Sequence, residues 1–408
     1  MLPYRDVADM PVTEYKPEPG DPPLGIYVHV PFCRSKCGYC DFCSHVPALG
    51  ETGRYLAALK TEIGLRTCDR PVRTVYIGGG TPSFLGAEPL TAILRSLRNT
   101  FSLQPDCEIT VEANPRDITA DWLEACRSAG VNRLSIGVQS MRDKDLRFLE
   151  RAHTAIEAVE AVRRARCAGF DNLGIDLIVD LPGHTPEITK ETLTRAIAEC
   201  APEHISCYQL TCAPGTRLHA AVERGEVRMP DSDTEFAIFM ATHKTLAELS
   251  YEGYEVSNFA RTLAHRSRHN SAYWTHRDYL GFGPSAHSFL NPVRSWNASS
   301  LSRYCDSLEG GALPVADQER LTALQLASEI ILLGLRTRDG FSHAKLRLLG
   351  VDLAAEKANA LADAESDGLL LTDGDAIRPT LNGLALADHL ALVLAPDTSN
   401  QDSVSSCH

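Results

Sequence analysis

Three cysteines near the start of the chain have a spacing that suits an inorganic cluster. Cys33, Cys37 and Cys40 follow a C-x3-C-x2-C pattern in a loop that also carries Arg34 and Lys36. Such a polar loop is a poor place to bury three thiols as ordinary core side chains. Iron–sulfur clusters are held by cysteine thiolates, and three cysteines leave one iron of a [4Fe–4S] cube without a protein ligand. A small molecule could bind at that iron.

Zinc is the competing interpretation of the same cysteines. A structural zinc site closes with four ligands, and Cys43 or His45 could supply the fourth. The spacing favours a metal or a cluster over structural thiols by a wide margin. It favours a cluster over zinc by only a modest one.

The composition of the chain excludes several other classes of protein. The 408 residues are 44% hydrophobic and carry a formal net charge of −13. This composition is that of a soluble globular protein, and we expect no nucleic-acid partner because an acidic chain offers no basic surface to a phosphate backbone. No apolar run is long enough to span a bilayer, and the first residues do not resemble a signal peptide. We therefore expect a cytoplasmic protein whose 13 cysteines are reduced.

Short apolar runs alternate with amphipathic segments from residue 25 onwards. This alternation predicts a parallel sheet whose strands are connected by helices. It indicates an α/β fold of the partial (β/α)6 barrel type, in which the carboxyl ends of the strands face one common site. The expected strands cover residues 25–30, 74–77, 108–112, 133–138, 173–179 and 204–210, and the expected helices cover about 52–65, 87–99, 119–129, 154–168 and 186–200.

Polar residues gather where these expected strands end. Three glycines at 78–80 follow the second strand, and consecutive glycines let backbone amides approach a ligand. Glu112 ends the third strand and Gln139 follows the fourth. Asp176 lies inside the apolar run of the fifth strand, where a carboxylate is costly unless it has a partner. That partner could be a neighbouring backbone group or a ligand at this end of the sheet.

Several segments of the chain, in this order, resemble one protein family. They are YVHVPFCRSKCGYCDF, YIGGGTPS, EANP, GVQS and IDLIVDLPG, and the likeness runs from about residue 24 to the 380s. The cysteine spacing, with an aromatic residue before the third cysteine, resembles the signature of the radical S-adenosylmethionine (SAM) superfamily. The whole set is similar to the oxygen-independent coproporphyrinogen III oxidases and to the related HemW-type heme chaperones. This resemblance implies that SAM binds the open iron of a [4Fe–4S] cluster.

The resemblance also implies roles for individual residues. Cys33, Cys37 and Cys40 would hold the cluster. Tyr27 would lie beside the SAM, and Gly79, Gly80 and Thr81 would meet its amino group. The rest of the SAM pocket would be lined by Glu112, Gln139, Arg151 and Asp176. These residue types suit SAM, because an ammonium group prefers carboxylate and carbonyl acceptors and an arginine binds a carboxylate well.

A second motif, HNSAYW, begins at His269 and lies beyond the expected barrel. A histidine beside aromatic residues and an amide is, in an isolated case, most often a hydrogen-bonded packing cluster. The pattern HNxxYW, however, resembles one that marks the HemW branch, where its histidine is implicated in heme binding. Because histidine is a common axial ligand of heme iron, the resemblance implies that His269 is the candidate heme ligand.

The chain divides into parts of different character. In the small C-terminal part, helices are followed by a hairpin near 368–379, which predicts a winged-helix-like domain that serves as a lid or a docking surface. The expected parts are a flexible lead-in at 1–22, the radical SAM barrel at 23–230, a connecting region with the HNxxYW motif at 231–317, the C-terminal domain at 318–394 and a tail at 395–408.

Two functions compete for these residues. One is a heme chaperone that binds heme and transfers it to an acceptor hemoprotein. The other is the SAM-dependent oxidative decarboxylation of coproporphyrinogen III in porphyrin biosynthesis. The chaperone is favoured, because the oxidases carry a fourth cysteine where this chain has Phe42, because Cys43 is shifted by one, and because HNxxYW is the chaperone pattern. The resemblance points to a respiratory acceptor and peripheral contact with the cytoplasmic face of a membrane, and it allows a homodimer.

Overall fold

The structure is a computed structural model that describes residues 23–396 of the chain. The lead-in expected at 1–22 and the part of the expected tail from 397 onwards lie outside the described residues. Within residues 23–396, no helix is long and apolar enough to cross a membrane.

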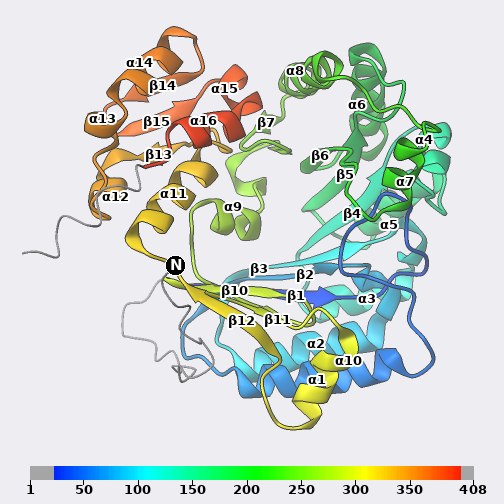
Figure 1. Ribbon diagram of the computed structural model, residues 1–408. Coiled ribbons are helices and arrows are strands. Elements are labelled where there is room, and N and C mark those ends of the chain that lie inside the picture. The colour runs from blue at the N-terminus through cyan, green and yellow to red at the C-terminus, as the bar shows by residue number, and fades with distance from the viewer. Residues whose placement is uncertain (1–22, 397–408) are drawn as a thin grey trace, which may run out of the picture.

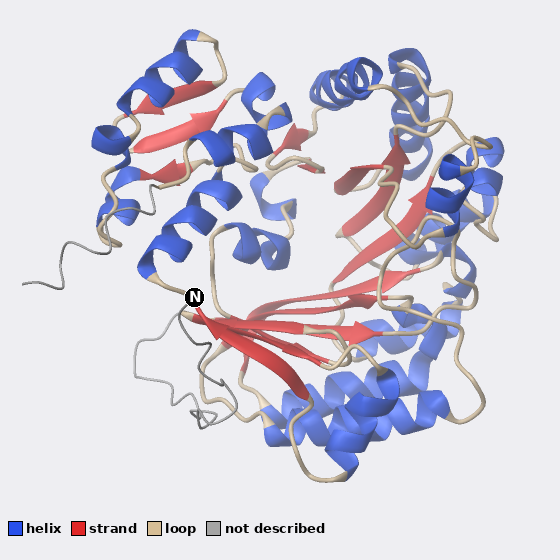
Figure 2. Ribbon diagram, viewed as in Figure 1, coloured by secondary structure: helices blue, strands red, loops and turns tan. Residues whose placement is uncertain are grey.

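The first part of the described chain folds into parallel strands separated by helices. The strands lie side by side in chain order, so each β-α-β unit adds the next strand to the sheet. Figure 1 shows the sheet curving around a central space, and Figure 2 shows the helices on its outer side. The elements are β1 (Leu24–Val30), α1 (Glu51–Leu65), β2 (Val72–Gly79), α2 (Ala87–Thr100), β3 (Leu103–Ala113), α3 (Ala120–Ser128), β4 (Arg133–Gln139), α4 (Asp143–Phe148), α5 (Ala155–Cys167), β5 (Leu173–Val179), α6 (Pro186–Cys200) and β6 (His204–Gln209).

The sequences of these elements explain why they form. In β1, the sequence LGIYVHV buries Ile26 and Val28 completely under the helices, while Tyr27 between them points to the inner side. The helices begin at side-chain caps; for example, Thr154 and Glu157 form a capping box at the start of α5. Six strand predictions and five helix predictions for the barrel agree with these elements to within a few residues.

Further strands extend both edges of the same sheet. β9 pairs in parallel with β1, and β10, β11 and β12 continue outward from β9, while β8 and β7 follow β6 at the other edge. These elements are β7 (Glu252–Gly253), β8 (Asn258–Ala260), β9 (Tyr279–Phe282), β10 (His287–Leu290), β11 (Val293–Asn297) and β12 (Val315–Arg320). The sequence pattern predicts no strands there, because these strands are short and β12, VADQER, is mostly polar.

Helix α9 (Arg268–Trp274), which carries the HNxxYW motif, lies on the concave side of the sheet. α7 (Arg217–Glu223) packs against the cysteine loop, where the amide of Leu218 donates to the carbonyl of Gly38 at 2.9 Å. On the outer side, α8 (Ser232–Glu248) packs on α6 and α10 (Leu301–Glu309) packs on α1.

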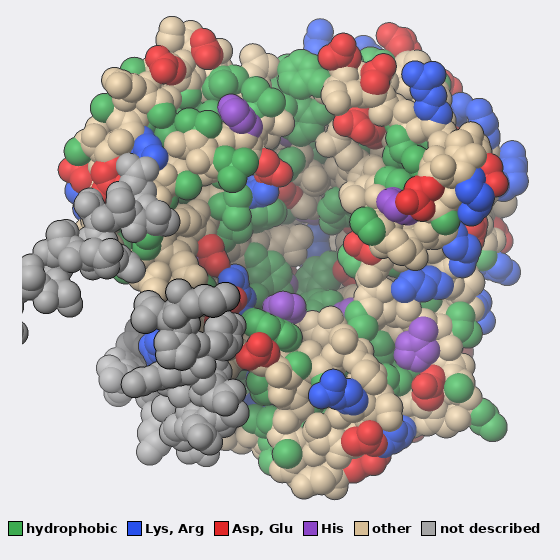
Figure 3. Space-filling model, in the orientation of Figure 1, with side chains coloured by type: hydrophobic (Ala, Val, Ile, Leu, Met, Phe, Trp, Pro, Cys, Tyr) green, Lys and Arg blue, Asp and Glu red, His purple; other side chains and the backbone are tan. Residues whose placement is uncertain are grey.

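A smaller unit with its own hydrophobic core follows the large sheet. It contains a sheet in the order β13-β15-β14, and α11 begins with a capping box between Thr322 and Gln325. Its elements are α11 (Ala323–Gly334), β13 (Phe341–Ser342), α12 (His343–Arg347), α13 (Leu353–Glu356), α14 (Ala358–Ser366), β14 (Leu370–Asp373), β15 (Ala376–Pro379), α15 (Leu381–Ala385) and α16 (Ala387–Val393). Between this unit and the barrel, the face drawn in Figure 3 is hollowed at its centre, where hydrophobic side chains are visible.

Candidate functional site

The three cysteines lie in a loop that leaves β1 and is closed by its own backbone. The amide of Cys33 donates to the carbonyl of His45 at 3.0 Å, and the amide of His45 donates to the carbonyl of Pro31 at 2.9 Å. Nζ of Lys36 reaches across the loop and donates to the carbonyl of Phe42 at 3.0 Å. The protein's own contacts therefore shape the loop.

A cavity of about 380 Å³ opens between this loop and the carboxyl ends of the strands. This is a usual volume for a ligand pocket. The cavity wall includes the three cysteines and most of the predicted SAM residues, namely Gly79, Gly80, Thr81, Glu112, Gln139, Arg151 and Asp176. Tyr27 does not line the cavity; its hydroxyl group contacts Nδ1 of His29 at 3.0 Å.

Polar donors point at two of the cysteine sulfur atoms. Oγ1 of Thr81 lies 3.4 Å from Sγ of Cys33, and Nη1 of Arg151 lies 3.7 Å from Sγ of Cys37. Nε of Arg151 is buried and has no hydrogen-bond partner. A guanidinium group beside thiolates stabilises their negative charge. Three cysteines and an incompletely satisfied arginine fit an anionic iron–sulfur cluster with a carboxylate-bearing ligand beside it.

The two candidates for a fourth zinc ligand have other partners. Sγ of Cys43 lies 3.4 Å from the carbonyl oxygen of Ser299, and Nε2 of His45 lies 3.1 Å from a carboxylate oxygen of Glu51. Neither side chain lines the cavity that holds the three cysteines. The fourth ligand of the alternative zinc site is therefore not supplied by Cys43 or His45 in this arrangement.

The three glycines after β2 allow the backbone to pass close to its neighbours. A Cβ atom at Gly79 would lie 2.6 Å from Nδ1 of His29, and one at Gly80 would lie 2.6 Å from the carbonyl oxygen of Phe32. Gly79 also has φ +111°, a value that residues with a side chain rarely adopt. Glycines are thus required here by the close packing against His29 and Phe32. This reason is separate from the predicted one, which is that glycines let a ligand approach the backbone.

Two carboxylates contribute to the cavity wall. Oε1 of Glu112 accepts from the hydroxyl group of Tyr76 at 2.7 Å, and Oε2 accepts from the amide of Gly79 at 3.1 Å. Burial raises the pKa of Glu112 from 4.5 to about 7, and the bond from Tyr76 opposes this shift. Asp176 accepts from Oγ of Ser135 at 3.1 Å, and burial raises its pKa as well. A cation in the cavity would stabilise the charged forms of both acids.

Gln139 has an unusual backbone conformation at the end of β4. Its φ is +68°, in the left-handed region that residues other than glycine rarely adopt. Nη2 of Arg151 donates to the carbonyl of Gly137, two residues before Gln139, at 3.3 Å. Strained residues of this kind cluster at ligand sites, which agrees with the predicted place of Gln139 in the pocket.

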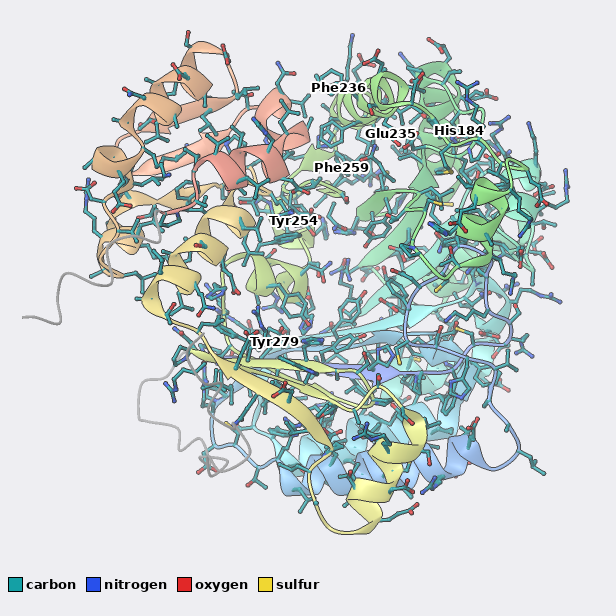
Figure 4. All side chains as sticks on the ribbon, viewed as in Figure 1. His184, Glu235, Phe236, Tyr254, Phe259 and Tyr279 are labelled. Atoms are coloured by element: carbon teal, nitrogen blue, oxygen red, sulfur yellow. The ribbon has the colours of Figure 1, made fainter. Side chains whose placement is uncertain are left out.

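His269 does not line the cavity; its side chain is buried on the concave side of the sheet, next to Tyr76 of the cavity wall. Its Nδ1 contacts Oγ1 of Thr74 at 2.9 Å, and its Nε2 contacts the hydroxyl group of Tyr273 at 2.8 Å. Figure 4 shows α9 between Tyr254 and Tyr279. The amide of Ser267, just before α9, donates to the hydroxyl group of Tyr254 at 3.3 Å, and the rings of Tyr273 and Tyr279 meet edge to face at 4.6 Å.

Sequence reasoning missed Tyr76, which lines the cavity and contacts Glu112. The alternation of side chains along β2 was the available signal, because it places Thr74, Tyr76 and Gly78 on the same face. The hydrogen bond between Tyr76 and Glu112 joins neighbouring strands, and a sequence pattern does not show such contacts.

Comparison with known proteins identifies the family. Residues 27–196 match the radical SAM superfamily, and residues 321–386 match the HemN C-terminal domain. The heme chaperone HemW of Mycobacterium tuberculosis is 38% identical over 384 residues, which span 93% of this chain and 96% of that protein. The chain belongs to the HemW family.

Further relatives agree with this HemW assignment. The heme chaperone HemW of Bacillus subtilis is 31% identical over 369 residues, covering 89% of this chain and 97% of that protein. Among solved structures, coproporphyrinogen III oxidase (HemN) of Escherichia coli, described as a radical SAM enzyme, has a TM-score of 0.79 at 27% identity, covering 92% of this chain and 90% of that one. The predicted family and the predicted radical SAM fold with a C-terminal domain are confirmed, and the superfamily implies a [4Fe–4S] cluster and SAM.

Proposed function

We propose that the protein is a heme chaperone that binds heme, a [4Fe–4S] cluster and SAM, and that transfers the heme to an acceptor hemoprotein. The observation that carries this proposal is the match to HemW over nearly the full length of both chains, at higher identity than the match to HemN. The HNxxYW motif and Phe42, at the place of the oxidases' fourth cysteine, support the same choice.

The loop cysteines Cys33, Cys37 and Cys40 would hold the cluster, which when bound supplies an iron that is open to SAM. Gly79, Gly80 and Thr81 would meet the amino group of SAM. The carboxylate of Glu112, which accepts from the amide of Gly79 and so lies beside this segment, would also accept a hydrogen bond from that group, and the guanidinium group of Arg151 would bind the carboxylate of SAM. Asp176 and Gln139 would complete the pocket, since ribose hydroxyls bind to such groups.

His269 is the proposed heme ligand, and its surroundings set a condition on that role. Burial, with a smaller contribution from the charge of Arg133, lowers the pKa of His269 to about 3, so the imidazole is neutral, as iron coordination requires. Both ring nitrogens have partners in this structure, Thr74 and Tyr273. Heme iron could therefore reach Nε2 only after Tyr273 releases it. The hollow in Figure 3, where hydrophobic side chains gather, would suit the apolar faces of a porphyrin.

The similarity in structure to HemN favours a second candidate function, the SAM-dependent oxidation of coproporphyrinogen III. Anaerobic incubation of the cluster-loaded protein with SAM, a reductant and coproporphyrinogen III would give the decarboxylated product if this function held. We expect no turnover above background.

The remaining parts of the proposal concern location and partners. We propose that the protein works in the cytoplasm, that its acceptor is a respiratory hemoprotein, and that it contacts the membrane peripherally when it delivers heme; the family resemblance also allows a homodimer. The net charge of −13 supports a role without nucleic acid.

Heme titration tests the main proposal directly. Wild type should bind heme and give a shifted Soret band, and His269→Ala should bind it more weakly with a changed spectrum. His243→Ala is the matched control. His243 is partly buried and burial lowers its pKa to about 4, but it lies on α8, outside the HNxxYW motif. An unchanged affinity and spectrum in His269→Ala would remove His269 as the ligand. Failure of wild type to bind heme would remove the chaperone function.

A further inference from the structure

Tyr76 contacts the ligand cavity and the HNxxYW helix at the same time. Its hydroxyl group donates to Oε1 of Glu112 at 2.7 Å. Its ring stacks on the imidazole of His269, with 5.2 Å between the ring centroids and 24° between the planes. One side chain of β2 therefore connects α9 with a carboxylate of the cavity wall.

Gly78 provides the space in which Tyr76 and Glu112 meet. A Cβ atom at Gly78 would lie 2.8 Å from Cε1 of Tyr76 and 2.9 Å from Cδ of Glu112. Real Cβ atoms do not approach other atoms so closely, so a side chain here would push the phenol ring and the carboxyl group apart. The absence of a side chain at position 78 of β2 thus allows the contact between Tyr76 and Glu112.

The ring of Tyr76 is held between other rigid groups. The ring of Tyr27 lies 6.3 Å from it, and Tyr27 is itself fixed by His29. On the side of α9, the carboxylate of Glu108 accepts from the amide of His269 at 3.1 Å and so holds the start of the helix. These contacts leave the phenol hydroxyl group little freedom to turn away from Glu112.

We propose that Tyr76 is a positioning residue for Glu112, and that α9 keeps Tyr76 in place through His269. The inference rests on the proposed function, since it takes the ammonium group of SAM as the partner of Glu112. With Tyr76 on Oε1 and the amide of Gly79 on Oε2, the carboxylate has one orientation toward the cavity. The motif helix thereby affects the pocket although none of its residues lines it.

The hydroxyl group of Tyr76 also affects the pH at which Glu112 ionises. A hydrogen bond to a carboxylate favours the charged form, so removal of this bond raises the pKa of Glu112 beyond about 7. Glu112 then pairs with an ammonium group only at higher pH. The other ionisable groups that face Glu112 stay unchanged; they are Tyr27 on β1, Arg133 on β4, Asp176 on β5, Tyr208 on β6 and Tyr273 on α9.

Tyr76→Phe tests the proposal, because it removes the hydroxyl group and keeps the stacked ring. Calorimetric titration of SAM into the cluster-loaded protein, from about pH 6 to about pH 9, should show about tenfold weaker binding at neutral pH and a profile displaced to higher pH. Tyr304→Phe is the matched control. It removes a hydroxyl group that donates to the buried carboxylate of Glu62 at 2.7 Å, outside the cavity, and it should leave SAM binding unchanged.

Each result decides a separate point. Equal affinity and an equal pH profile in Tyr76→Phe and wild type would overturn the proposal, and so would an equal loss in Tyr304→Phe. His269→Ala should displace the profile in the same direction by a smaller amount; an undisplaced profile would overturn the part assigned to α9. If wild type itself failed to bind SAM, the proposed function would fail instead.

Discussion

Replacing Glu112 by glutamine isolates the contribution of its charge to ligand binding. Glu112→Gln keeps the length of the side chain and an acceptor oxygen, but it removes the negative charge that would strengthen the hydrogen bond from the amino group that we assign to this place. A hydrogen bond to a charged group contributes about 1.5–3 kcal/mol, and about 1.4 kcal/mol corresponds to a factor of ten in affinity. We therefore expect SAM to bind about 10- to 150-fold more weakly to the variant.

The pKa of Glu112 also predicts how the affinity for SAM changes with pH. The pKa of Glu112 is about 7, so below that pH the carboxyl group is protonated and cannot pair with an ammonium group. An α-amino group loses its own proton near pH 8. SAM affinity of wild type should thus be highest between about pH 7 and 8, and Glu112→Gln should lose the decline on the acid side.

The same substitution should not weaken the unliganded fold. Glu112 has a pKa of 4.5 in the unfolded chain and about 7 in the folded protein. As the pH rises from 4.5 to about 7, its ionisation therefore lowers the free energy of unfolding, and above about pH 7 this loss of stability stays constant. At about 1.36 kcal/mol for each unit, the cost reaches as much as about 3 kcal/mol. Near pH 8, Glu112→Gln should therefore unfold at the same temperature as wild type or a higher one.

Calorimetric SAM titration and thermal unfolding at several pH values test these expectations together. Glu255→Gln is the matched control, because Glu255 is buried and burial raises its pKa to about 7 as well, but it does not line the cavity. The control should bind SAM as wild type does. Unchanged affinity in Glu112→Gln, with the acid decline retained, would refute the assignment of Glu112.

Three further substitutions test other parts of the account. Gly78→Ala should separate the phenol ring from the carboxyl group and weaken SAM binding about tenfold or more in calorimetry; equal affinity would contradict the packing argument. Glu62→Ala removes a fully buried carboxylate and with it the ion-pair partner of Arg66, so the free energy of unfolding should fall by about 3–5 kcal/mol; a loss below about 1 kcal/mol would contradict the claim that this buried ion pair stabilises the fold. Cys43→Ala should keep the visible absorbance of the cluster, because Sγ of Cys43 points to Ser299; bleaching would restore Cys43 as a ligand.

The barrel strands could be predicted from sequence because their burial leaves a continuous apolar signal. β1 and β5 are apolar along almost their whole length, and each is followed by a periodic helix. The outer strands carry no such signal. β12 is polar because it lies at the edge of the sheet, where one side meets solvent. The division of the chain into five parts stays a prediction.

The place of the HNxxYW helix could not be predicted, because α9 is only seven residues long. The side of α9 that faces the sheet carries polar groups: His269 is buried there, with hydrogen-bond partners from β2 and from α9 itself. A short helix that fills the inside of a curved sheet has no surface stripe for periodicity to detect. The cavity residues were found by resemblance, and the roles of Cys33, Glu112 and His269 in binding stay predictions.

Mössbauer spectroscopy of the anaerobically reconstituted protein tests the central claim most directly. We expect a [4Fe–4S] signal in which one iron differs from the other three, a change at that iron when SAM is added, and loss of the signal in Cys37→Ala. A protein that contains only zinc after reconstitution, or a cluster whose spectrum does not respond to SAM, would contradict the claim that Cys33, Cys37 and Cys40 hold a cluster with an open iron.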